Sequence, residues 1–374
     1  MRAGSKNALV LSGESLNMIY TNKGLLELLL QSTDEMDVVI GCRVSPKQKG
    51  DIVALMRMRH EGKVTLAIGD GANDCSMIMK AHVGVGIAGK EGMQAARSAD
   101  FAIGKFKFLH KLLFVHGREA YRRNGELILF MFYKNVLYVM VQFLFGYFSI
   151  FSGQSMYEKW IYQIYNVTFT GLHNMWYALF DFEFEKEILM NTPILYSIGM
   201  HNLIFNMQEF WLWFAYACAQ SAMILGVCFY VAEDSPVEDG KSFNFWAGGH
   251  HVYMNCVLLA NLIIFKMQHN YTGWNAVIIA AQISSYFVLL WYFSIELQTD
   301  VIYRFMDEFT ASNPAWLGCF FVVSSLWTID NMLHALRVAL RSCWETDVKQ
   351  TPEGHRHDDL GIPTGSMAKV DGEL

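Results

Sequence analysis

The chain has 374 residues, of which 53% are hydrophobic and 14% aromatic, whereas only 17% are charged. Such an apolar composition is typical of a protein with membrane-embedded segments and argues against an entirely soluble chain. The formal net charge of −6 leaves no basic surplus for holding a polyanion, so the sequence disfavours nucleic-acid binding.

The seven cysteines include no CxxC pair, and several lie in long apolar runs. We therefore expect reduced, buried cysteines that act as small hydrophobic residues. The first residues, MRAGSKNALVLSG, lack the apolar core and cleavage site of a signal peptide, so the chain is expected to start in the cytosol.

Up to about Lys107, short apolar runs alternate with amphipathic stretches. The order predicts strand, helix, strand, helix, strand, in the segments NALVLSG, GLLELLLQS, MDVVIGCR, QKGDIVALMRMRHEG and KVTLAIGDG. This alternation favours a parallel sheet covered by helices, which binds ligands beyond the carboxyl ends of its strands. The loop after TLAIG is thus the first place to look for chemistry.

Beyond Arg123 the sequence becomes apolar over long stretches. Each stretch is near the ~20 residues that a helix needs to cross the hydrocarbon of a bilayer, and none has the polar face of a soluble helix. We predict six membrane spans, at roughly 127–150, 161–181, 208–231, 247–267, 274–295 and 314–336.

Basic residues predict the orientation of these spans. Six lysines and arginines lie between residues 105 and 123, whereas the predicted outer loops contain only Lys159, Lys241 and Arg304. Since positive charge accumulates on the cytoplasmic side, the first part and both termini should be cytosolic. The tail at 343–374 has the composition of a disordered segment.

The run GDGANDCSMI at 69–78 follows a strand-like stretch and opens a helix-like one. Asp70 and Asp74 supply oxygen ligands suited to Mg²⁺, and Asn73 can donate its amide to a phosphate oxygen. The glycines allow the backbone to turn sharply beside a phosphoryl group. A tight turn with a helix-capping aspartate is the alternative, but the complete pattern is far more specific than a lone Asp-Gly.

A second element, CRVSPKQK at 42–49, ends an apolar strand and starts the next predicted helix. Lys49 is placed to neutralise charge on a transferring phosphoryl group, with Arg43 as a second cation for nucleotide phosphate. By composition alone Lys47 could serve equally, and each lysine could equally be a surface charge.

Together with AHVGVGIAGKEGMQAARSADFAI at 81–103 and FYKN at 132–135, these motifs closely resemble the carboxyl-terminal portion of a type IV P-type ATPase, a phospholipid flippase. The resemblance implies that Asp70 and Asp74 organise Mg²⁺ and that Lys49 contacts an aspartyl phosphate. It further implies that Arg43, Lys49, Asn73 and Asp74 border ATP, whose hydrolysis drives lipid from the outer to the cytosolic leaflet. A two-span accessory subunit is the partner that it implies.

The sequence also departs from that family. No DKTGT phosphorylation motif is present, and segments resembling the actuator domain, the nucleotide-binding domain and the first four membrane helices are missing. We expect a truncated chain that has no ATPase activity by itself, since a phosphoryl pump needs its nucleophilic aspartate.

In the region of the first two predicted spans, no Asp or Glu lies between Leu127 and Tyr157 or between Trp160 and Phe180. A dehydrated cation would find few ligands there. Lys134 lies in the first of these spans, on a stripe with Tyr138 and Gln142 and beside Asn135. Its ammonium should face protein, water or an anionic headgroup, or snorkel to the interface.

The family resemblance favours headgroup handling by Lys134. Asn166, Thr168 and Thr170 form a milder polar set in the second span, where interhelical hydrogen bonds are an equal alternative. Many relatives have a Leu-Pro-Pro-like break where this chain has Leu172-His173-Asn174, which puts the local kink in doubt. In the last span Asp330, Asn331 and His334 form a polar cluster for which structural pairing is the favoured role.

The predicted architecture is a partial α/β phosphorylation domain, haloacid-dehalogenase-like with a Rossmannoid parallel sheet, followed by an all-α bundle of six transmembrane helices. Its parts are a cytosolic domain at 1–105, a stalk at 106–126, the membrane domain at 127–342 and the tail. The predicted lipid path contains Lys134, Asn135 and Asn166. The alternatives are a non-catalytic fragment that modulates a full-length relative and, with less support, a cation pump fragment; a tethered soluble phosphatase is weakest.

Overall fold

A computed structural model describes residues 7–89, 92–233, 245–295, 316–332 and 335. The chain divides into two compact units, Met1–Leu113 and Phe114–Leu374. The predicted tail at 343–374 and His334 lie outside the described residues.

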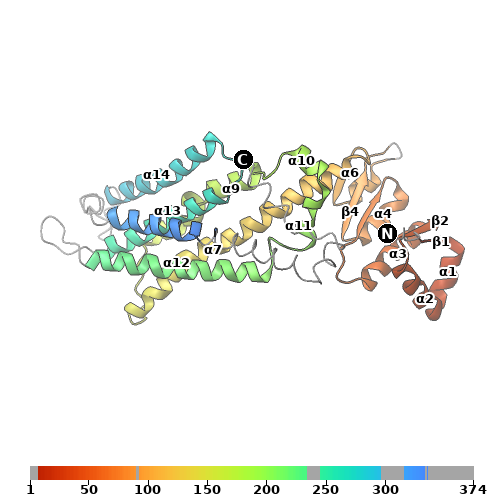
Figure 1. The fold of residues 1–374 in the computed structure, drawn as a ribbon, viewed down its shortest axis with the longest axis horizontal. Helices are drawn as coiled ribbons and strands as arrows, with labels where there is room; N and C mark the ends of the chain where they lie inside the picture. The colour runs from red at the N-terminus through yellow and green to blue at the C-terminus, as the bar shows by residue number, and fades with distance from the viewer. Residues whose placement is uncertain (1–6, 90–91, 234–244, 296–315, 333–334, 336–374) are drawn as a thin grey trace, which may run out of the picture. The chain divides into compact units, whose positions relative to one another are not determined.

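The first unit begins with the predicted alternation of strands and helices, which is confirmed except that two helices rather than one separate the first two strands. Its elements in chain order are β1 (Ala8–Ser12), α1 (Gly13–Thr21), α2 (Lys23–Asp34), β2 (Val38–Cys42), α3 (Pro46–Arg59) and β3 (Leu66–Gly69). After a 3-10 turn at Ala72–Asp74 follow α4 (Cys75–Lys80), β4 (Val83–Ile87), α5 (Gln94–Ser98), β5 (Phe101–Ile103) and α6 (Phe108–Lys111) (Figure 1).

The strands pair in parallel, as the alternation predicts, but they form two sheets in the described part of the chain. β1 pairs with β2, with Ala8 opposite Val38. The second sheet has the order β3-β4-β5, with Leu66 opposite Val83 and Val85 opposite Phe101. β2 is exposed along its whole length. Apart from β1, no described strand pairs with it, so the described strands do not form the single sheet that the alternation suggests.

The start of α3 is determined by its own sequence. Ser45 and Gln48 form a capping box, in which the Ser45 nitrogen donates to Gln48 Oε1 at 2.8 Å, and Pro46 occupies the first helical position. Further along, α3 packs tightly on α4 because Gly50 has no side chain. A Cβ at this position would lie 2.4 Å from Ser76 Oγ.

The second unit is helical. A π-helical stretch at Leu112–Gly117 leads into α7 (Arg118–Phe148), and α8 (Lys159–Ile164), a second π-helical stretch at Tyr165–Phe169 and α9 (Gly171–Phe180) follow. The remaining helices are α10 (Lys186–Asn191), α11 (Ser197–Met200), α12 (Met207–Glu233), α13 (Phe245–Met267) and α14 (Gly273–Ile295), and residues 316–332 are helical as well.

Four helices of the described residues are long and apolar enough to cross a membrane: Phe108–Phe148, Met207–Phe229, Phe245–Met267 and Gly273–Ser294. Two of the six predicted spans are not among these four helices. The second segment is interrupted at its π-helical stretch, and the sixth lies only partly within the described residues.

The core of the second unit is built around α13, which is buried along most of its length. Tyr253 packs against Tyr138, Tyr165 and Tyr286. A Cβ on Gly249 would lie 2.2 Å from the Met156 carbonyl oxygen, so α13 passes very close to that backbone. The six described cysteines are free, as expected, and Cys228, Cys256 and Cys319 are buried. Burial was wrongly predicted for Cys42, which is exposed in β2, and for Cys75 and Cys218, which are half-buried. Cys343 lies outside the described residues.

Candidate functional site

The loop after β3 brings together two of the predicted site residues. Lys49, in the second turn of α3, places its Nζ atom 2.7 Å from Asp74 Oδ1. Asp74 lies at the junction of the 3-10 turn and α4, and its side chain is 14% exposed. Burial acts to raise the pKa of Asp74, but the hydrogen bond and charge of Lys49 lower it below its ordinary value. Asp74 is thus an ionised carboxylate.

Glycines on both sides of the loop leave room for the two aspartates. A Cβ on Gly69 would lie 2.3 Å from Asp74 Cβ. Gly89, which follows β4, has its Cβ position 3.6 Å from Asp70 Cβ and 3.9 Å from Asp70 Oδ2. The carboxyl ends of neighbouring parallel strands meet at one edge, so Asp70 lies where β3 and β4 end.

The donor chemistry of this edge fits Mg²⁺, which takes one or two protein carboxylates and completes its shell with water and substrate phosphate. Asp70 and Asn73 are exposed, and Asp74 is ionised. No group of three or more His, Cys, Asp or Glu side chains in the described ranges is arranged as a complete metal site. A magnesium ion held here would therefore depend on phosphate oxygens for part of its coordination.

Arg43 has an unusual backbone conformation that the sequence did not reveal. Its φ is +51°, in the left-handed region that non-glycine residues rarely adopt. It directly follows β2 and is exposed. A Cβ on Gly13 would lie 2.6 Å from the Arg43 carbonyl oxygen, so the turn at Arg43 is packed closely against the start of α1.

α3 joins the ends of three strands. Gln48, buried in α3, donates its Nε2 to the Gly13 carbonyl at 2.8 Å and to Asn17 Oδ1 at 2.9 Å, which ties the turn after β2 to the turn after β1. The Lys49–Asp74 pair ties it to the end of β3. A third contact, between Asp51 and Lys80 at 2.6 Å, fixes α3 against α4. The structure thus gathers strand ends that are distant in sequence.

In the second unit, Lys134 points into protein. Its residue is 0% exposed, and its Nζ donates to Thr170 Oγ1 at 2.8 Å. Thr170 in turn donates to the Tyr165 carbonyl at 2.9 Å. Of the alternatives that the sequence allows, snorkelling to the interface is therefore wrong, because the ammonium is buried against the second predicted span.

The second predicted span is broken at this lysine. Residues Tyr165–Phe169 are π-helical, and Thr170 has φ −137° and ψ 3°, outside the helical range. A Cβ on Gly171 would lie 2.9 Å from the Asn166 carbonyl oxygen. This chain has no prolines at Leu172-His173-Asn174, but the helix of the second segment is interrupted nonetheless. The interruption lies at Thr170 and Gly171.

The other two predicted lipid-path residues bind each other. Asn166 Nδ2 donates to Asn135 Oδ1 at 3.1 Å, which links the second segment to α7 next to Lys134. Asn166 is exposed and Asn135 is half-buried. Polar groups of the two segments therefore pair in two neighbouring places, one buried at Lys134 and one near the surface.

Two side chains from α13 and the residues after it contact the second segment beside its interruption. The sequence alone did not indicate these contacts. Asn261 of α13 is 1% exposed and donates its Nδ2 to the Phe169 carbonyl at 2.9 Å. Gln268 Nε2 lies 2.7 Å from His173 Nε2. Asn261 thus gives the Phe169 carbonyl, which lies beside the interruption, a side-chain donor from α13. In the sequence, Asn261 stands out as a polar residue in an apolar span, and such residues commonly form hydrogen bonds to neighbouring helices.

A buried ionic cluster stands at the start of α7. Arg122, whose side chain is 2% exposed, contacts Glu119 at 3.0 Å, Glu126 at 3.0 Å and Asp181 at 2.9 Å. Asp181 Oδ1 also accepts from the nitrogens of His269 and Asn270, in the connection between α13 and α14. The three- and four-residue spacings of Arg122 predict part of this cluster, whereas the contact with Asp181 depends on the tertiary structure.

In the last helical segment, Asp330 and Asn331 both accept from Lys266 of α13, with the Asn331 contact at 2.7 Å. Structural pairing was the favoured interpretation of these two residues, and these contacts bear it out. The third member of the predicted cluster, His334, lies outside the described residues.

Comparison with known proteins adds the family. Residues 96–342 match the model of the phospholipid-translocating P-type ATPase C-terminal region. The chain belongs to this family. It is 34% identical to mouse phospholipid-transporting ATPase IH over 94% of its own length and 41% identical to phospholipid-transporting ATPase DRS2 of Saccharomyces cerevisiae over 67%. A third relative, phospholipid-transporting ATPase dnf1 of Schizosaccharomyces pombe, is 35% identical over 91% of the chain.

The chain spans only part of the length of these relatives. The matched regions cover 30% of the mouse protein, 22% of the Schizosaccharomyces protein and 19% of the Saccharomyces protein. The resemblance inferred from the motifs is thus confirmed, and so are the parallel strands and apolar helices of a C-terminal flippase region.

Proposed function

We propose that this chain forms the C-terminal part of an ATP-driven phospholipid translocase that moves lipid from the outer to the cytosolic leaflet. It would hold the magnesium and phosphate half-site and the membrane helices. The aspartyl nucleophile belongs to a motif that this sequence does not contain, so the chain by itself would not turn over ATP.

One observation favours a lipid over a cation as the transported substrate. Lys134 is buried against the broken second segment, and no carboxylate lies in α7 beyond Leu127 or between Trp160 and Phe180. A pump for a dehydrated cation needs anionic oxygens along its path. An ammonium held by a threonine hydroxyl, with an asparagine pair beside it, instead suits the phosphate and polar groups of a lipid headgroup.

In the half-site, Asp70 and Asp74 would hold Mg²⁺, which when bound neutralises phosphate charge. Lys49 would contact the phosphoryl group, since its ammonium already lies at the Asp74 carboxylate. Arg43 and Asn73, both exposed near the ends of β2 and β3, would border the nucleotide. A two-span accessory subunit, six spans and cytosolic termini are further parts of this proposal.

The test of cargo is uptake of fluorescent phospholipid by vesicles that contain the complete pump carrying this C-terminal part. Lys134→Ala should lower lipid uptake or change headgroup preference, while Lys111→Ala, an exposed lysine of α6, should do neither. Unchanged transport and preference in Lys134→Ala would remove this lysine from the lipid path.

A second candidate function is a non-catalytic membrane protein that modulates a full-length relative. The absence of the DKTGT motif from the sequence favours it. Phosphate release from the purified chain with Mg-ATP tests the inactivity that both candidates share. Turnover comparable to that of a complete pump would contradict both the inactivity of the chain and its modulating role.

A further inference from the structure

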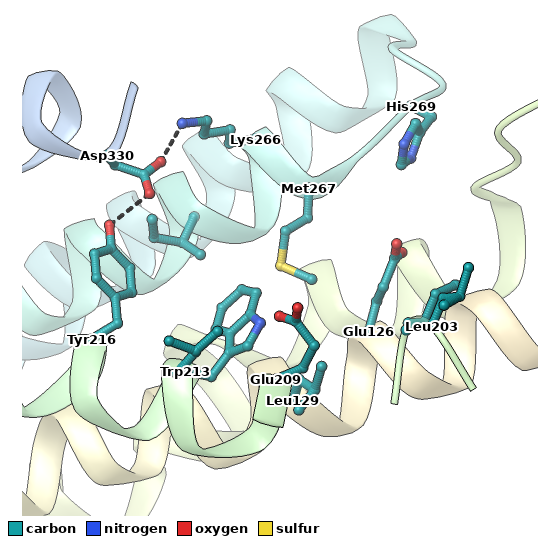
Figure 2. Close-up of a pocket in the computed structure, with 13 residues that line it drawn as sticks. Glu126, Leu129, Leu203, Glu209, Trp213, Tyr216, Lys266, Met267, His269 and Asp330 are labelled. Atoms are coloured by element: carbon teal, nitrogen blue, oxygen red, sulfur yellow. Dashed lines mark hydrogen bonds and ion pairs between the residues drawn. The ribbon is translucent and has the colours of Figure 1, made fainter. Parts of the chain in front are cut away.

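The connection between α13 and α14 holds a histidine beside the ionic cluster of Arg122. His269 follows the end of α13 by two residues, and its side chain is 39% exposed. Figure 2 shows it on the same side of a pocket as Glu126 of α7. Water therefore reaches the ring, although charged side chains surround it.

The Nδ1 atom of His269 lies between a donor and an acceptor. Arg122 Nη1 is 3.3 Å away, within hydrogen-bond distance, and Asp181 Oδ2 is 3.6 Å away, within the range of an ion pair. A neutral ring that carries its proton on Nε2 can accept from the guanidinium at Nδ1. A charged ring, protonated at both nitrogens, is attracted to the carboxylate and repelled by the guanidinium. One proton thus decides which of the two residues the ring contacts.

The two partners belong to different segments. Arg122 lies in the second turn of α7, whereas Asp181 directly follows α9. Asp181 Oδ1 also accepts from the backbone nitrogens of His269 and Asn270, at 2.9 and 3.0 Å. These backbone contacts hold the connection at the end of α9 whatever the charge of the ring. The hydrogen bond from Arg122 to the ring, by contrast, requires an Nδ1 atom without a proton.

The titratable and charged groups around His269 come from all the segments beside it. Among the described residues they are Arg118, Glu119, Arg122 and Glu126 of α7, Tyr177, Asp181 and Glu183 of α9 and the residues after it, Tyr271 of its own connection, and Glu209, Lys266 and Asp330 along the pocket. Lys266 binds Asp330, so this pair adds little net charge.

Negative charge is in surplus close to the ring. Four carboxylates share the two guanidinium groups of the cluster, which are Glu119, Glu126, Asp181 and Glu183 against Arg118 and Arg122. Burial lowers the pKa of His269, as does the charge of Arg122, but the contact with Asp181 and the other carboxylates raise it above its ordinary value. The ring therefore holds its proton to a higher pH than an ordinary histidine, whose pKa is about 6.5.

We propose that His269 is a proton-operated switch between α7 and the end of the second segment. The deprotonated ring accepts from Arg122 at Nδ1 and links the α13–α14 connection to α7. The protonated ring pairs with Asp181 and releases that link. The observed distances, with Nδ1 closer to Arg122 than to Asp181, correspond to the deprotonated form. The switch does not rest on the proposed lipid path at Lys134.

The test follows the ring nitrogens of His269 by NMR in the full chain, labelled with nitrogen-15 at histidine and reconstituted in nanodiscs, from about pH 5 to about pH 9. His269→Gln identifies the signals by their loss. We expect Nδ1 to give up its proton as the pH rises, and the neutral ring to keep its proton on Nε2. Asp181→Asn should lower the titration midpoint by about one pH unit, because it removes the carboxylate that pairs with the charged ring.

Two further variants sharpen the result. Arg122→Met should raise the midpoint and increase the neutral form that is protonated at Nδ1, because the guanidinium no longer donates to that atom. The matched control is Glu187→Gln, which removes an exposed carboxylate of α10 and should leave the midpoint unchanged.

Stability gives a second measurement, for which neither the Arg122 nor the Asp181 variant has to fold. A group whose pKa is raised by folding stabilises the protein below its ordinary pKa, and this contribution is lost as the pH rises through the raised value. Wild type should therefore resist unfolding by SDS better than His269→Gln at low pH and equally at high pH. His201→Gln, which changes an exposed histidine after α11, should behave like wild type throughout.

Three outcomes would overturn the switch. The first is an unshifted midpoint in Asp181→Asn, and the second is a neutral ring that carries its proton on Nδ1 in wild type. The third is a stability difference between wild type and His269→Gln that does not change with pH. None of these measurements uses ATP or a transported lipid, so their outcomes are independent of the proposed transport.

Discussion

Replacing Arg122 with methionine tests the ionic cluster at the start of α7. The change removes contacts with Glu119, Glu126 and Asp181 but keeps most of the apolar length of the side chain. Asp181 is then left 1% exposed, with the two backbone nitrogens of the α13–α14 connection and the His269 ring, at 3.6 Å, as its remaining partners among the described residues. Removing one partner of a buried ion pair costs about 3–5 kcal/mol, which corresponds to roughly two to four powers of ten in the unfolding equilibrium.

The measurement is unfolding of the nanodisc-reconstituted or detergent-solubilised chain by SDS, followed by tryptophan fluorescence. Arg123→Met is the matched control, because this neighbouring arginine donates, within the described part of the chain, only to the backbone carbonyls of Glu119 and Leu179 at 3.4 and 3.1 Å. Its loss should cost about 1 kcal/mol. If Arg122→Met costs no more than Arg123→Met, the cluster does not stabilise the unit as argued.

A double substitution separates buried charge from packing. Adding Asp181→Asn to Arg122→Met removes the carboxylate that the first change leaves unpaired. The two costs should therefore be non-additive, with a coupling of about 1–3 kcal/mol. Additive costs would show that the arginine acts through its packing alone.

Three further predictions concern other contacts. Gly50→Ala should destabilise the first unit by about 1–3 kcal/mol, because its Cβ would lie 2.4 Å from Ser76 Oγ, although alanine by itself favours helix. The control in urea unfolding is Gly62→Ala, whose Cβ would have nothing within 4 Å. Equal effects of the two substitutions would refute the close packing of α3 on α4. Because the pKa of Asp74 is lowered, its ion pair with Lys49 stabilises the protein above the ordinary carboxyl pKa, and this stabilisation is lost as the pH falls through the lowered pKa. The difference in unfolding free energy between wild type and Asp74→Asn should thus shrink below about pH 4. A difference that does not change with pH would contradict the pairing. Asn261→Leu should lower the unfolding free energy in SDS by about 1–3 kcal/mol, because it leaves the Phe169 carbonyl without this donor. Asn261→Gln should retain part of the contact and lose less stability. Identical losses of stability in the two variants would show that the hydrogen bond is unimportant.

Much of the first unit follows from short-range sequence patterns. The alternation of apolar runs predicts the strands up to β3, and the Ser45–Gln48 capping box with Pro46 determines where α3 begins. These features depend on residues only a few positions apart, so they are visible without a structure. The division of the strands into two sheets is not, because pairing joins segments separated by whole helices.

The candidate sites show the same contrast. The motifs identify Lys49, Asp70 and Asp74 by type and spacing, but they leave Lys47 and Lys49 equivalent, and the 2.7 Å contact with Asp74 distinguishes them. In the second unit, hydropathy predicts where Lys134 lies along its span but not which way it faces. The contact with Thr170, across 36 positions in sequence, gives that direction.

The sequence by itself determined the family, the alternation of strands and helices in the first unit and the positions of the apolar segments, because hydrophobic period, capping residues and compact motifs are local properties. The tertiary structure alone decided that the second segment breaks at Thr170, that Arg122 and Asp181 share a buried cluster and that Glu209 faces a pocket. Each of these depends on side chains from several helices meeting in space, and the free energy that holds them there arises only when distant segments pack together.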